Sequence, residues 1–285
     1  MLSLGLSNRP KLSPETFRLL RDVIYVRSGI AFAEAKTYLL ETRLSRRLEI
    51  RGLKTFEDYY YFLTYDPERE QEFTQLLNVI VTNETSFFRD QTQLDVFSKG
   101  VVPRIMEEKS RSGSKNLRIW SAACSTGEEP YTLAMLLMEA GLPAKGWTIE
   151  IVASDISEIV LRAAEAGHYD KYSLRNTPDV YQKKYFSNSA DAFSIKESVR
   201  GFVRYKRINL IEANDTRSVI GFDVIFCRNV FIYFDDVSKK RAVSHLYDSL
   251  ARGGYLFVGF SESLHNITRL FKPVSIDRSL VYQKA

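Results

Sequence analysis

The sequence predicts an α/β protein with a doubly wound, mostly parallel sheet, preceded by an all-helical unit. Three observations lead to this fold class. From residue 117 onward, short β-prone runs alternate with helix-forming runs, as parallel strands do when crossover helices join them. Residues 13–80 instead show apolar side chains at helical spacing. The last two β-prone runs are close enough in sequence to form a hairpin, which predicts an antiparallel C-terminal edge.

The first 80 residues are expected to form a unit of four helices. Ser13, Pro14 and Glu15 provide a helix cap with proline at the first helical position, and Gly29 ends that helix. Gly52 is expected to end the second helix in the same way. The expected helices cover residues 14–28, 34–51, 56–64 and 67–79.

Residues 81–100 are expected to be a polar and aromatic connector, or lid, before a sheet domain of residues 101–285. The expected strands cover residues 117–120, 148–153, 203–208, 222–227, 254–259, 271–275 and 279–283. The expected helices cover about 128–141, 157–166 and 237–251. Residues 168–202 interrupt the alternation and are long for a crossover, so an insertion of about 168–207 should form a small β subdomain with its own short helix.

The composition is that of a soluble globular protein, with 285 residues, 45% hydrophobic and 26% charged. The longest apolar run, Leu133 to Met138, is far shorter than the roughly 20 residues that span a membrane. The first residues lack the pattern of an export signal. Two cysteines and three scattered histidines show no metal-ligand spacing. We therefore expect a reduced, cytoplasmic protein without a metal and without membrane insertion.

The net charge of +5 is unevenly distributed. Residues 1–54 hold eleven Lys and Arg against five Asp and Glu, which suggests that an acidic partner docks there. Four arginines of the second helix lie within an arc of roughly 140° and share one face. They are Arg43, Arg46, Arg47 and Arg51. A solvated surface is the plainer interpretation, but arginine suits carboxylate recognition well.

The most informative segment is Leu117 to Tyr131, with the sequence LRIWSAACSTGEEPY. A β-prone run, a tight turn and a helix start follow one another, which places a ligand site at the tip of a parallel strand. The turn carries Glu128 and Glu129 and has no lysine, unlike phosphate-binding loops. It therefore indicates a cationic or hydroxyl-rich ligand, such as a sulfonium nucleoside.

Two further strand ends carry polar side chains. Asp155 lies at the C-terminal end of the second strand and can accept hydrogen bonds from both ribose hydroxyls of a nucleoside, although it would also serve as a helix cap. Asn229 and Tyr233 follow the strand at 222–227, where an amide can bind adenine or a carboxylate. The aromatic residues around Tyr233 could equally pack a turn.

The connector contains the segment NETSFFR, Asn83 to Arg89. Its polar residues, two phenylalanines and arginine are best explained as a staple between the helical unit and the sheet. The alternative is a lid over the ligand, with Arg89 facing an anion.

Together these segments resemble the CheR family of chemotaxis receptor methyltransferases. The resemblance covers nearly the whole chain and rests on five segments in order: NETSFFR, WSAACSTGEEPY, ASDI, INL at residues 208–210, and CRNVFIYF. It implies a Rossmann-like methyltransferase sheet and S-adenosylmethionine as the methyl donor, with S-adenosylhomocysteine as the product and no metal. It also implies that the acceptors are glutamates in the cytoplasmic domains of transmembrane chemoreceptors, so the chain would be a protein-glutamate O-methyltransferase, and we expect a monomer.

The resemblance also assigns roles to residues. It implies that Arg89 and Tyr233 lie nearest the transferring methyl group. It implies that the donor is bound by Asn83, Thr85, Arg89, Ala123, Glu129, Asp155, Asn209, Leu210, Arg228 and Asn229. It implies that the arginine face, Arg43, Arg46, Arg47 and Arg51, meets acidic receptor helices.

One departure and two alternatives remain. Family members that tether to a receptor pentapeptide carry a longer, glycine-bearing loop than Ser187 to Gly201, so we expect no pentapeptide tether. One alternative is a methyltransferase acting on nucleic acid, but the basic residues cluster at the N-terminus and no [DN]PP[YF] motif is present. The other is a non-catalytic adaptor that senses the nucleoside.

Overall fold

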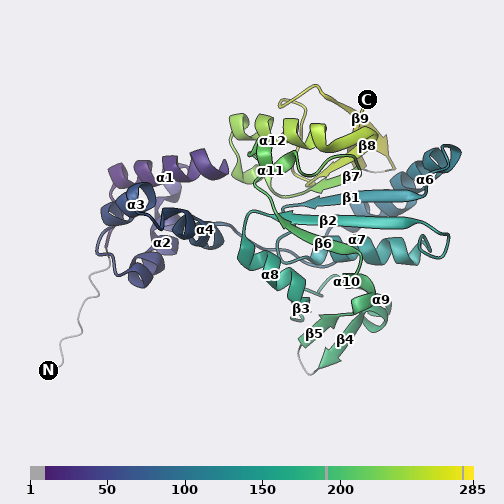
Figure 1. Ribbon diagram of the computed structural model, residues 1–285, viewed down its shortest axis with the longest axis horizontal. Coiled ribbons are helices and arrows are strands. Elements are labelled where there is room, and N and C mark those ends of the chain that lie inside the picture. The colour runs from purple at the N-terminus through teal and green to yellow at the C-terminus, as the bar shows by residue number, and fades with distance from the viewer. Residues whose placement is uncertain (1–9, 190–191, 278) are drawn as a thin grey trace. The chain divides into compact units, whose positions relative to one another are not determined.

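The computed structural model describes residues 10–189, 192–277 and 279–285, and it divides into two compact units (Figure 1). We call Met1–Thr82 the helical unit and Asn83–Ala285 the sheet unit. The sequence alternation from residue 117 onward lies entirely within the second of these.

The regular elements in the described part of the helical unit are helices. They are α1 (Pro14–Ser28), η1 (Glu34–Lys36), α2 (Thr37–Arg51), α3 (Phe56–Tyr65) and α4 (Arg69–Ile80). The Ser13 side chain accepts from the Thr16 amide at the start of α1, and Gly29 ends that helix with φ 74°. Thr55 and Asp58 form a capping box at the start of α3. The expected four-helix unit is confirmed, with η1 as an added single turn.

The sheet unit is built on seven strands in the order β6-β2-β1-β7-β8-β10-β9. The strands are β1 (Asn116–Ala122), β2 (Thr148–Asp155), β6 (Val203–Arg207), β7 (Phe222–Cys227), β8 (Leu250–Val258), β9 (Phe271–Ile276) and β10 (Ser279–Lys284). Strands β6, β2, β1, β7 and β8 run parallel, and β10 is antiparallel to both β8 and β9. The predicted mostly parallel sheet with an antiparallel edge hairpin is therefore confirmed.

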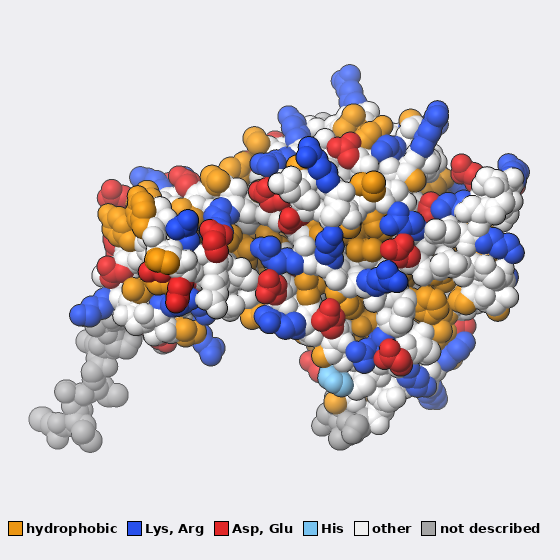
Figure 2. Space-filling model, in the orientation of Figure 1, with side chains coloured by type: hydrophobic (Ala, Val, Ile, Leu, Met, Phe, Trp, Pro, Cys, Tyr) orange, Lys and Arg blue, Asp and Glu red, His pale blue; other side chains and the backbone are white. Residues whose placement is uncertain are grey.

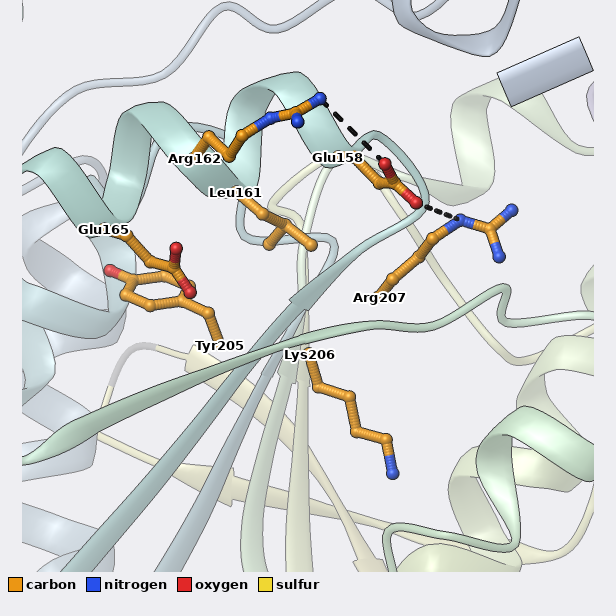
Figure 3. Close-up of a pocket in the computed structure, with 7 residues that line it drawn as sticks. All are labelled: Glu158, Leu161, Arg162, Glu165, Tyr205, Lys206 and Arg207. Atoms are coloured by element: carbon orange, nitrogen blue, oxygen red, sulfur yellow. Dashed lines mark ion pairs between the residues drawn. The ribbon is translucent and has the colours of Figure 1, made fainter. Parts of the chain in front are cut away.

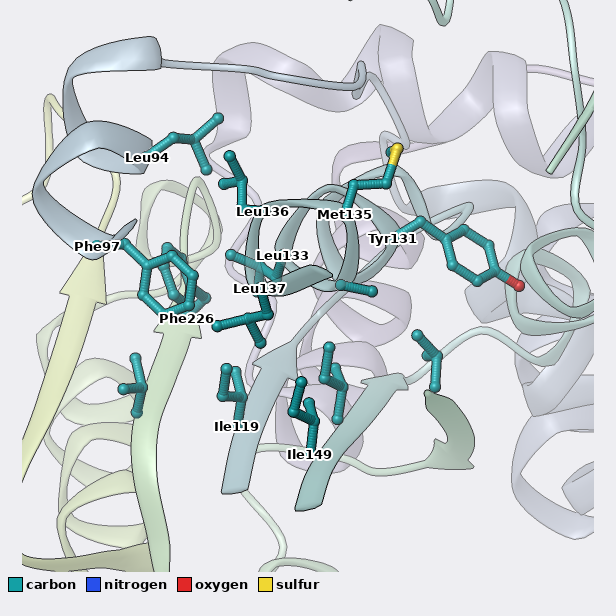
Figure 4. Packing of buried hydrophobic residues seen from close by; sticks show 14 of the residues in the cluster. Leu94, Phe97, Ile119, Tyr131, Leu133, Met135, Leu136, Leu137, Ile149 and Phe226 are labelled. Atoms are coloured by element: carbon teal, nitrogen blue, oxygen red, sulfur yellow. The ribbon is translucent and has the colours of Figure 1, made fainter. Parts of the chain in front are cut away.

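Helices cover both faces of this sheet because its central strands carry apolar side chains in both directions. Ile119 and Phe226 pack with helix α7 (Glu128–Glu139) on one face (Figure 4). Trp120 and Ile225, one residue along each strand, pack with helix α12 (Asp236–Ser249) on the other. Helices α8 (Glu158–Ala166) and α11 (Ala213–Thr216) complete the crossovers, so the sheet is doubly wound.

Part of the expected connector is instead helical. Its second half forms α5 (Gln91–Asp95) and most of the π-helix η2 (Val96–Val101), and α6 (Val102–Arg111) follows directly. The Asp90 side chain caps α5, and Leu94, Phe97 and Ile105 are buried against the sheet. Polar residues on the outer face conceal this apolar stripe in the sequence, so no helix was predicted in this segment.

The insertion forms the small β subdomain that the sequence predicts. Its strands are β3 (His168–Tyr169), β4 (Phe186–Ser189) and β5 (Ala192–Ile195), in the antiparallel order β3-β5-β4. Helices α9 (Asp179–Tyr185) and α10 (Glu197–Arg200) flank it. Among the described residues, no helix is long and apolar enough to cross a membrane.

Candidate functional site

The carboxyl ends of β1 and β7 and the segment before α5 hold their backbone in uncommon conformations. Six described residues other than glycine have positive φ, and only Asp277 lies outside these segments. The other five are Phe88 (54°), Asp90 (65°), Ala123 (58°), Ser125 (51°) and Asn229 (59°). Because such conformations are costly and cluster at functional sites, they mark this edge of the sheet as the candidate site.

The loop between β1 and α7 is held tightly against its neighbours. The Cys124 amide donates to the Ser154 carbonyl at the end of β2 (2.8 Å). Gly127 has φ 93° and begins α7, and a Cβ there would lie 2.8 Å from both Ala164 Cβ and Tyr205 Oη. Only glycine fits this turn, which explains the single glycine of the motif.

Asp155 is buried at the end of β2 and fixed by two backbone amides. Its Oδ2 accepts from the Ser125 amide and its Oδ1 from the Ser157 amide, both at 3.0 Å. Burial raises the pKa of Asp155, and hydrogen bonds from backbone amides act in the opposite direction. Helix α8 is capped by the Ser157 side chain, so the helix-cap interpretation does not account for Asp155.

The two acids of the first motif have different surroundings. Glu128 is buried, accepts from Thr126 Oγ1 (2.7 Å), and has a pKa raised by burial. Glu129 is half-buried; its Oε1 accepts from Ser121 Oγ (2.7 Å) and its Oε2 from Arg228 Nη1 (3.2 Å). Of the two acids, Glu129 is therefore the one that a ligand at the strand ends can contact.

Arg228 joins three segments of the site. Besides Glu129 at the start of α7, its guanidinium donates through Nη2 to the Arg89 carbonyl (2.9 Å) and lies 3.6 Å from Asp90 Oδ2. Arg228 is only 9% exposed, and its Nε has no hydrogen-bond partner among the described residues. A buried hydrogen-bond donor without a partner costs free energy. Arg228 Nε can therefore still donate a hydrogen bond to a ligand.

The two residues expected nearest the methyl group are both half-buried. Arg89 Nη1 donates to the Glu84 carbonyl (3.1 Å), so its guanidinium is held by its own segment. Tyr233 ends the short helix η3 (Phe231–Tyr233) after β7. Among the described residues, no hydrogen bond joins the two side chains.

The segment Asn83–Arg89 is anchored within the sheet unit. Phe87 and Phe88 are buried; the Phe87 amide donates to the Ser173 carbonyl (3.0 Å) and the Phe88 amide to Thr132 Oγ1 (3.2 Å). Asn83 and Thr85 are half-buried, and the Asn83 carbonyl accepts from Ser125 Oγ (3.4 Å). The phenylalanines thus fix polar residues beside the β1–α7 loop.

Asn209 and Leu210 follow β6 and are both buried. The Asn209 amide donates to Asp215 Oδ2 (2.9 Å), and its Oδ1 accepts from the Ile211 amide (3.3 Å). The Leu210 side chain belongs to the core cluster on the α12 face. Half-buried Ala123, with its positive φ, lies at the end of β1.

The four arginines of α2 do not form one exposed face. Arg47 is 8% exposed and makes two hydrogen bonds to Glu72 of α4, from Nε (2.8 Å) and Nη2 (2.6 Å). Arg51 Nε also donates to Glu72 (2.6 Å), and Arg43 donates to Thr82 Oγ1 (3.0 Å) and to the carbonyl of residue 80. Of the four, only Arg46 is exposed. Arg47 is therefore paired within the helical unit, which helical spacing alone does not reveal because Glu72 is buried on a neighbouring helix.

Sequence reasoning missed Glu262, which follows β8. Its carboxylate accepts backbone amides from the loops after β7 and β8. The available signal was an acid three residues after Gly259, at the end of a strand in the parallel part of the sheet.

A surface pocket lies between α8 and β6 (Figure 3). Its lining residues are Glu158, Leu161, Arg162, Glu165, Tyr205, Lys206 and Arg207, none of them a predicted site residue. Glu158 lies 3.9 Å from Arg162 and 4.0 Å from Arg207, so its charges are partly paired. On the face shown in Figure 2, Lys and Arg side chains alternate with Asp and Glu and form no continuous basic stripe. Among the described residues, no cluster of three or more His, Cys, Asp or Glu could hold a metal ion.

The fold and the loops at its carboxyl edge define the catalytic domain of an α/β methyltransferase. Residues 83–280 match the family model "CheR methyltransferase, SAM binding domain", where SAM is S-adenosylmethionine, and residues 15–81 match "CheR methyltransferase, all-alpha domain". The chain belongs to the CheR methyltransferase family, as the five sequence segments predict.

The sequence is similar to those of curated relatives over most of its length. The chain is 35% identical over 278 residues to chemotaxis protein methyltransferase 2 of Vibrio cholerae, covering 97% of this chain and 95% of the relative. It is 36% identical over 252 residues to the chemotaxis protein methyltransferase of Borreliella burgdorferi, covering 88% of each. A third relative, chemotaxis protein methyltransferase 1 of Pseudomonas aeruginosa, is 32% identical over 94% of this chain and 97% of its own length.

Proposed function

We propose that this protein transfers the methyl group of S-adenosylmethionine to glutamate carboxylates of chemoreceptor cytoplasmic domains, forming glutamate methyl esters and S-adenosylhomocysteine. The observation that carries the proposal is the Arg228 cluster, in which Glu129, the Arg89 backbone and the β7 loop meet at one sheet edge. The names of the relatives, all chemotaxis protein methyltransferases, support the same class of substrate.

The residues present fit the donor. Backbone amides hold buried Asp155 in place. Its carboxylate oxygens keep further lone pairs, which can accept hydrogen bonds from a ribose diol. Half-buried Glu129 supplies negative charge for a cationic ligand, and the loop has no lysine that would repel it. Arg228 Nε, which no described residue accepts from, offers a hydrogen-bond donor for a carboxylate. We assign the remaining donor contacts to Asn83, Thr85, Ala123, Asn209, Leu210 and Asn229.

The bound donor supplies an electrophilic methyl group on a sulfonium. A glutamate with a pKa near 4.3 is already ionised at neutral pH, so this chain needs no general base. Its residues must align the carboxylate oxygen with the methyl group and exclude water, which would otherwise stabilise the separated charges. We assign to Arg89 the orientation of the incoming carboxylate, for which it exchanges its bond to the Glu84 carbonyl, and to Tyr233 the positioning of either reactant.

The helical unit is the part that we assign to receptor docking. Exposed Arg46 is its main contact, and half-buried Arg43 and Arg51 keep part of their charge accessible. The short Ser187–Gly201 segment supports action without a pentapeptide tether; residues 190–191 within it lie outside the described residues. We further propose that the protein acts in the cytoplasm as a monomer, without a metal and without nucleic acid.

The test is incubation with methyl-labelled donor and membranes rich in chemoreceptors, followed by assay for base-labile esters. We expect label in receptor glutamates, and Arg89→Ala should lower turnover about a hundredfold. Near-normal turnover by that variant would refute the role of Arg89. Label in total RNA but not in receptors would indicate a nucleic-acid enzyme, and donor binding without transfer would indicate an adaptor.

A further inference from the structure

Glu262 connects two loops at the carboxyl edge of the sheet. Its Oε2 accepts from the Asn229 amide (2.9 Å) and the Gly259 amide (2.7 Å), and its Oε1 accepts from the Ile232 amide (3.3 Å). Asn229 belongs to the loop after β7 and Ile232 to the short helix η3 that follows this loop, whereas Gly259 belongs to the loop after β8. One carboxylate therefore satisfies backbone donors that no regular element satisfies.

The close approach of the two loops depends on Gly259. A Cβ at this position would lie 2.7 Å from Glu262 Oε2, 2.9 Å from the Asn229 amide nitrogen and 3.1 Å from Asn229 Nδ2. Neighbouring Phe260 is 91% exposed, so its side chain does not anchor the loop. The carboxylate of Glu262, rather than apolar packing of Phe260, holds the loops together at this point.

The segment that Glu262 holds is the one that carries the chemistry. Asn229 has φ 59°, an uncommon conformation for a non-glycine residue. The hydrogen bond from its backbone amide to Glu262 helps to maintain this conformation. The preceding residue is Arg228, the centre of the site cluster, and Tyr233 lies one residue beyond Ile232. Charge-assisted bonds to an ionised carboxylate are among the stronger hydrogen bonds.

We propose that Glu262 is a positioning residue for methyl transfer: it locks the β7 loop so that Arg228, Asn229 and Tyr233 are preorganised for the donor and the acceptor. The turnover part of this inference rests on the proposed function. The donor-binding part does not, because it concerns only the S-adenosylmethionine-binding domain.

The test compares Glu262→Gln with Glu139→Gln in the full-length chain. Both replace a carboxylate that accepts several hydrogen bonds in the sheet unit, but Glu139 bonds Lys184 and Tyr185 at the far end of α7 (2.7 Å each). We measure adenosylhomocysteine affinity by calorimetry, hydrogen exchange of residues 227–234, melting temperature, and kcat and KM with receptor. For Glu262→Gln we expect affinity and kcat to fall about tenfold or more, with faster exchange confined to this segment. For Glu139→Gln we expect neither, whatever its melting temperature.

Unchanged affinity and exchange in Glu262→Gln would overturn the inference, as would equal losses in both variants at equal melting temperature. Gly259→Ala provides a second perturbation if Glu262→Gln does not fold, and it should weaken affinity in the same direction. If wild-type protein methylates no receptor, the proposed function fails, yet affinity and exchange still decide the role of Glu262.

Discussion

Two buried arginine–acid clusters, one in each unit, differ in how completely their hydrogen bonds are satisfied. In the helical unit, Glu72 is inaccessible to solvent and accepts four hydrogen bonds, two from Arg47, one from Arg51 and one from Tyr59. In the sheet unit, Arg228 contacts Glu129 and Asp90, but its Nε has no hydrogen-bond partner within the described part of the chain. The first cluster has no acceptor capacity left and is structural, whereas the second retains capacity for a ligand.

Breaking the Glu72 cluster should give the largest change in stability. Glu72→Gln leaves the buried guanidinium of Arg47 without its carboxylate, while Arg51 keeps only its pairing with Glu68, so the free energy of unfolding should fall by about 3 kcal/mol. Adenosylhomocysteine affinity of the folded protein should stay the same. Chemical denaturation and calorimetry check both statements. A loss of affinity without a loss of stability would reverse the roles of the two clusters.

The opposite pattern is expected for Arg228→Lys. A lysine keeps the charge but cannot bridge Glu129 and the Arg89 carbonyl as a planar guanidinium does, nor replace Nε. Adenosylhomocysteine affinity should fall by roughly 2 kcal/mol, about thirtyfold, with a smaller change in melting temperature. Wild-type affinity in this variant would show that the cluster merely joins the loops.

The two units should also respond differently to acid. Burial raises the pKa of Asp155, so its ionised form is lost at a higher pH than that of an ordinary aspartate, and folding is favoured as pH falls through this window. Burial alone would raise the pKa of Glu72, but hydrogen bonds from Arg47, Arg51 and Tyr59 outweigh it and lower the pKa. Its contribution to stability is present above the pKa of an unfolded glutamate and is lost as pH falls through the lowered value.

Acidification from neutral pH should therefore weaken adenosylhomocysteine binding several-fold before the helical unit loses stability. Calorimetry across pH, together with denaturation monitored in the helical unit, measures the two responses. Asp155→Asn is the control, because it should bind more weakly and lose the pH dependence in this window. If wild type and Asp155→Asn showed the same pH profile, another group would be responsible.

The local pattern of the sequence predicted the sheet well because both of its faces are apolar. Trp120 and Ile119 point to opposite faces and each is fully buried, so the strand is evident from composition alone. The helical run after Asp90 was missed because Gln91, Thr92 and Gln93 make it polar where it begins. Its burial depends on contacts with distant strands, which no short window contains.

Only the site residues that lie at the converging strand ends could be predicted. Asp155 and Glu129 follow from strand and turn positions, whereas the Arg47–Glu72 pair joins two helices and leaves no local signal. Glu262 was missed for a similar reason, since its role lies in accepting amides from a loop about 30 residues earlier in the chain. Helical periodicity therefore could not predict which arginines of α2 are exposed.

The smallest expected effect comes from the arginine that neither cluster uses. Arg46 is exposed, so Arg46→Glu should leave stability and adenosylhomocysteine affinity unchanged. If the helical unit docks acidic receptor helices, the variant should raise KM for receptor several-fold, with unchanged kcat and a weaker dependence of KM on salt. Arg104→Glu, which reverses an exposed charge of the sheet unit, is the matched control and should not alter KM. Equal changes in KM for both variants would show that net charge, and not a docking face on α2, governs encounter with the receptor.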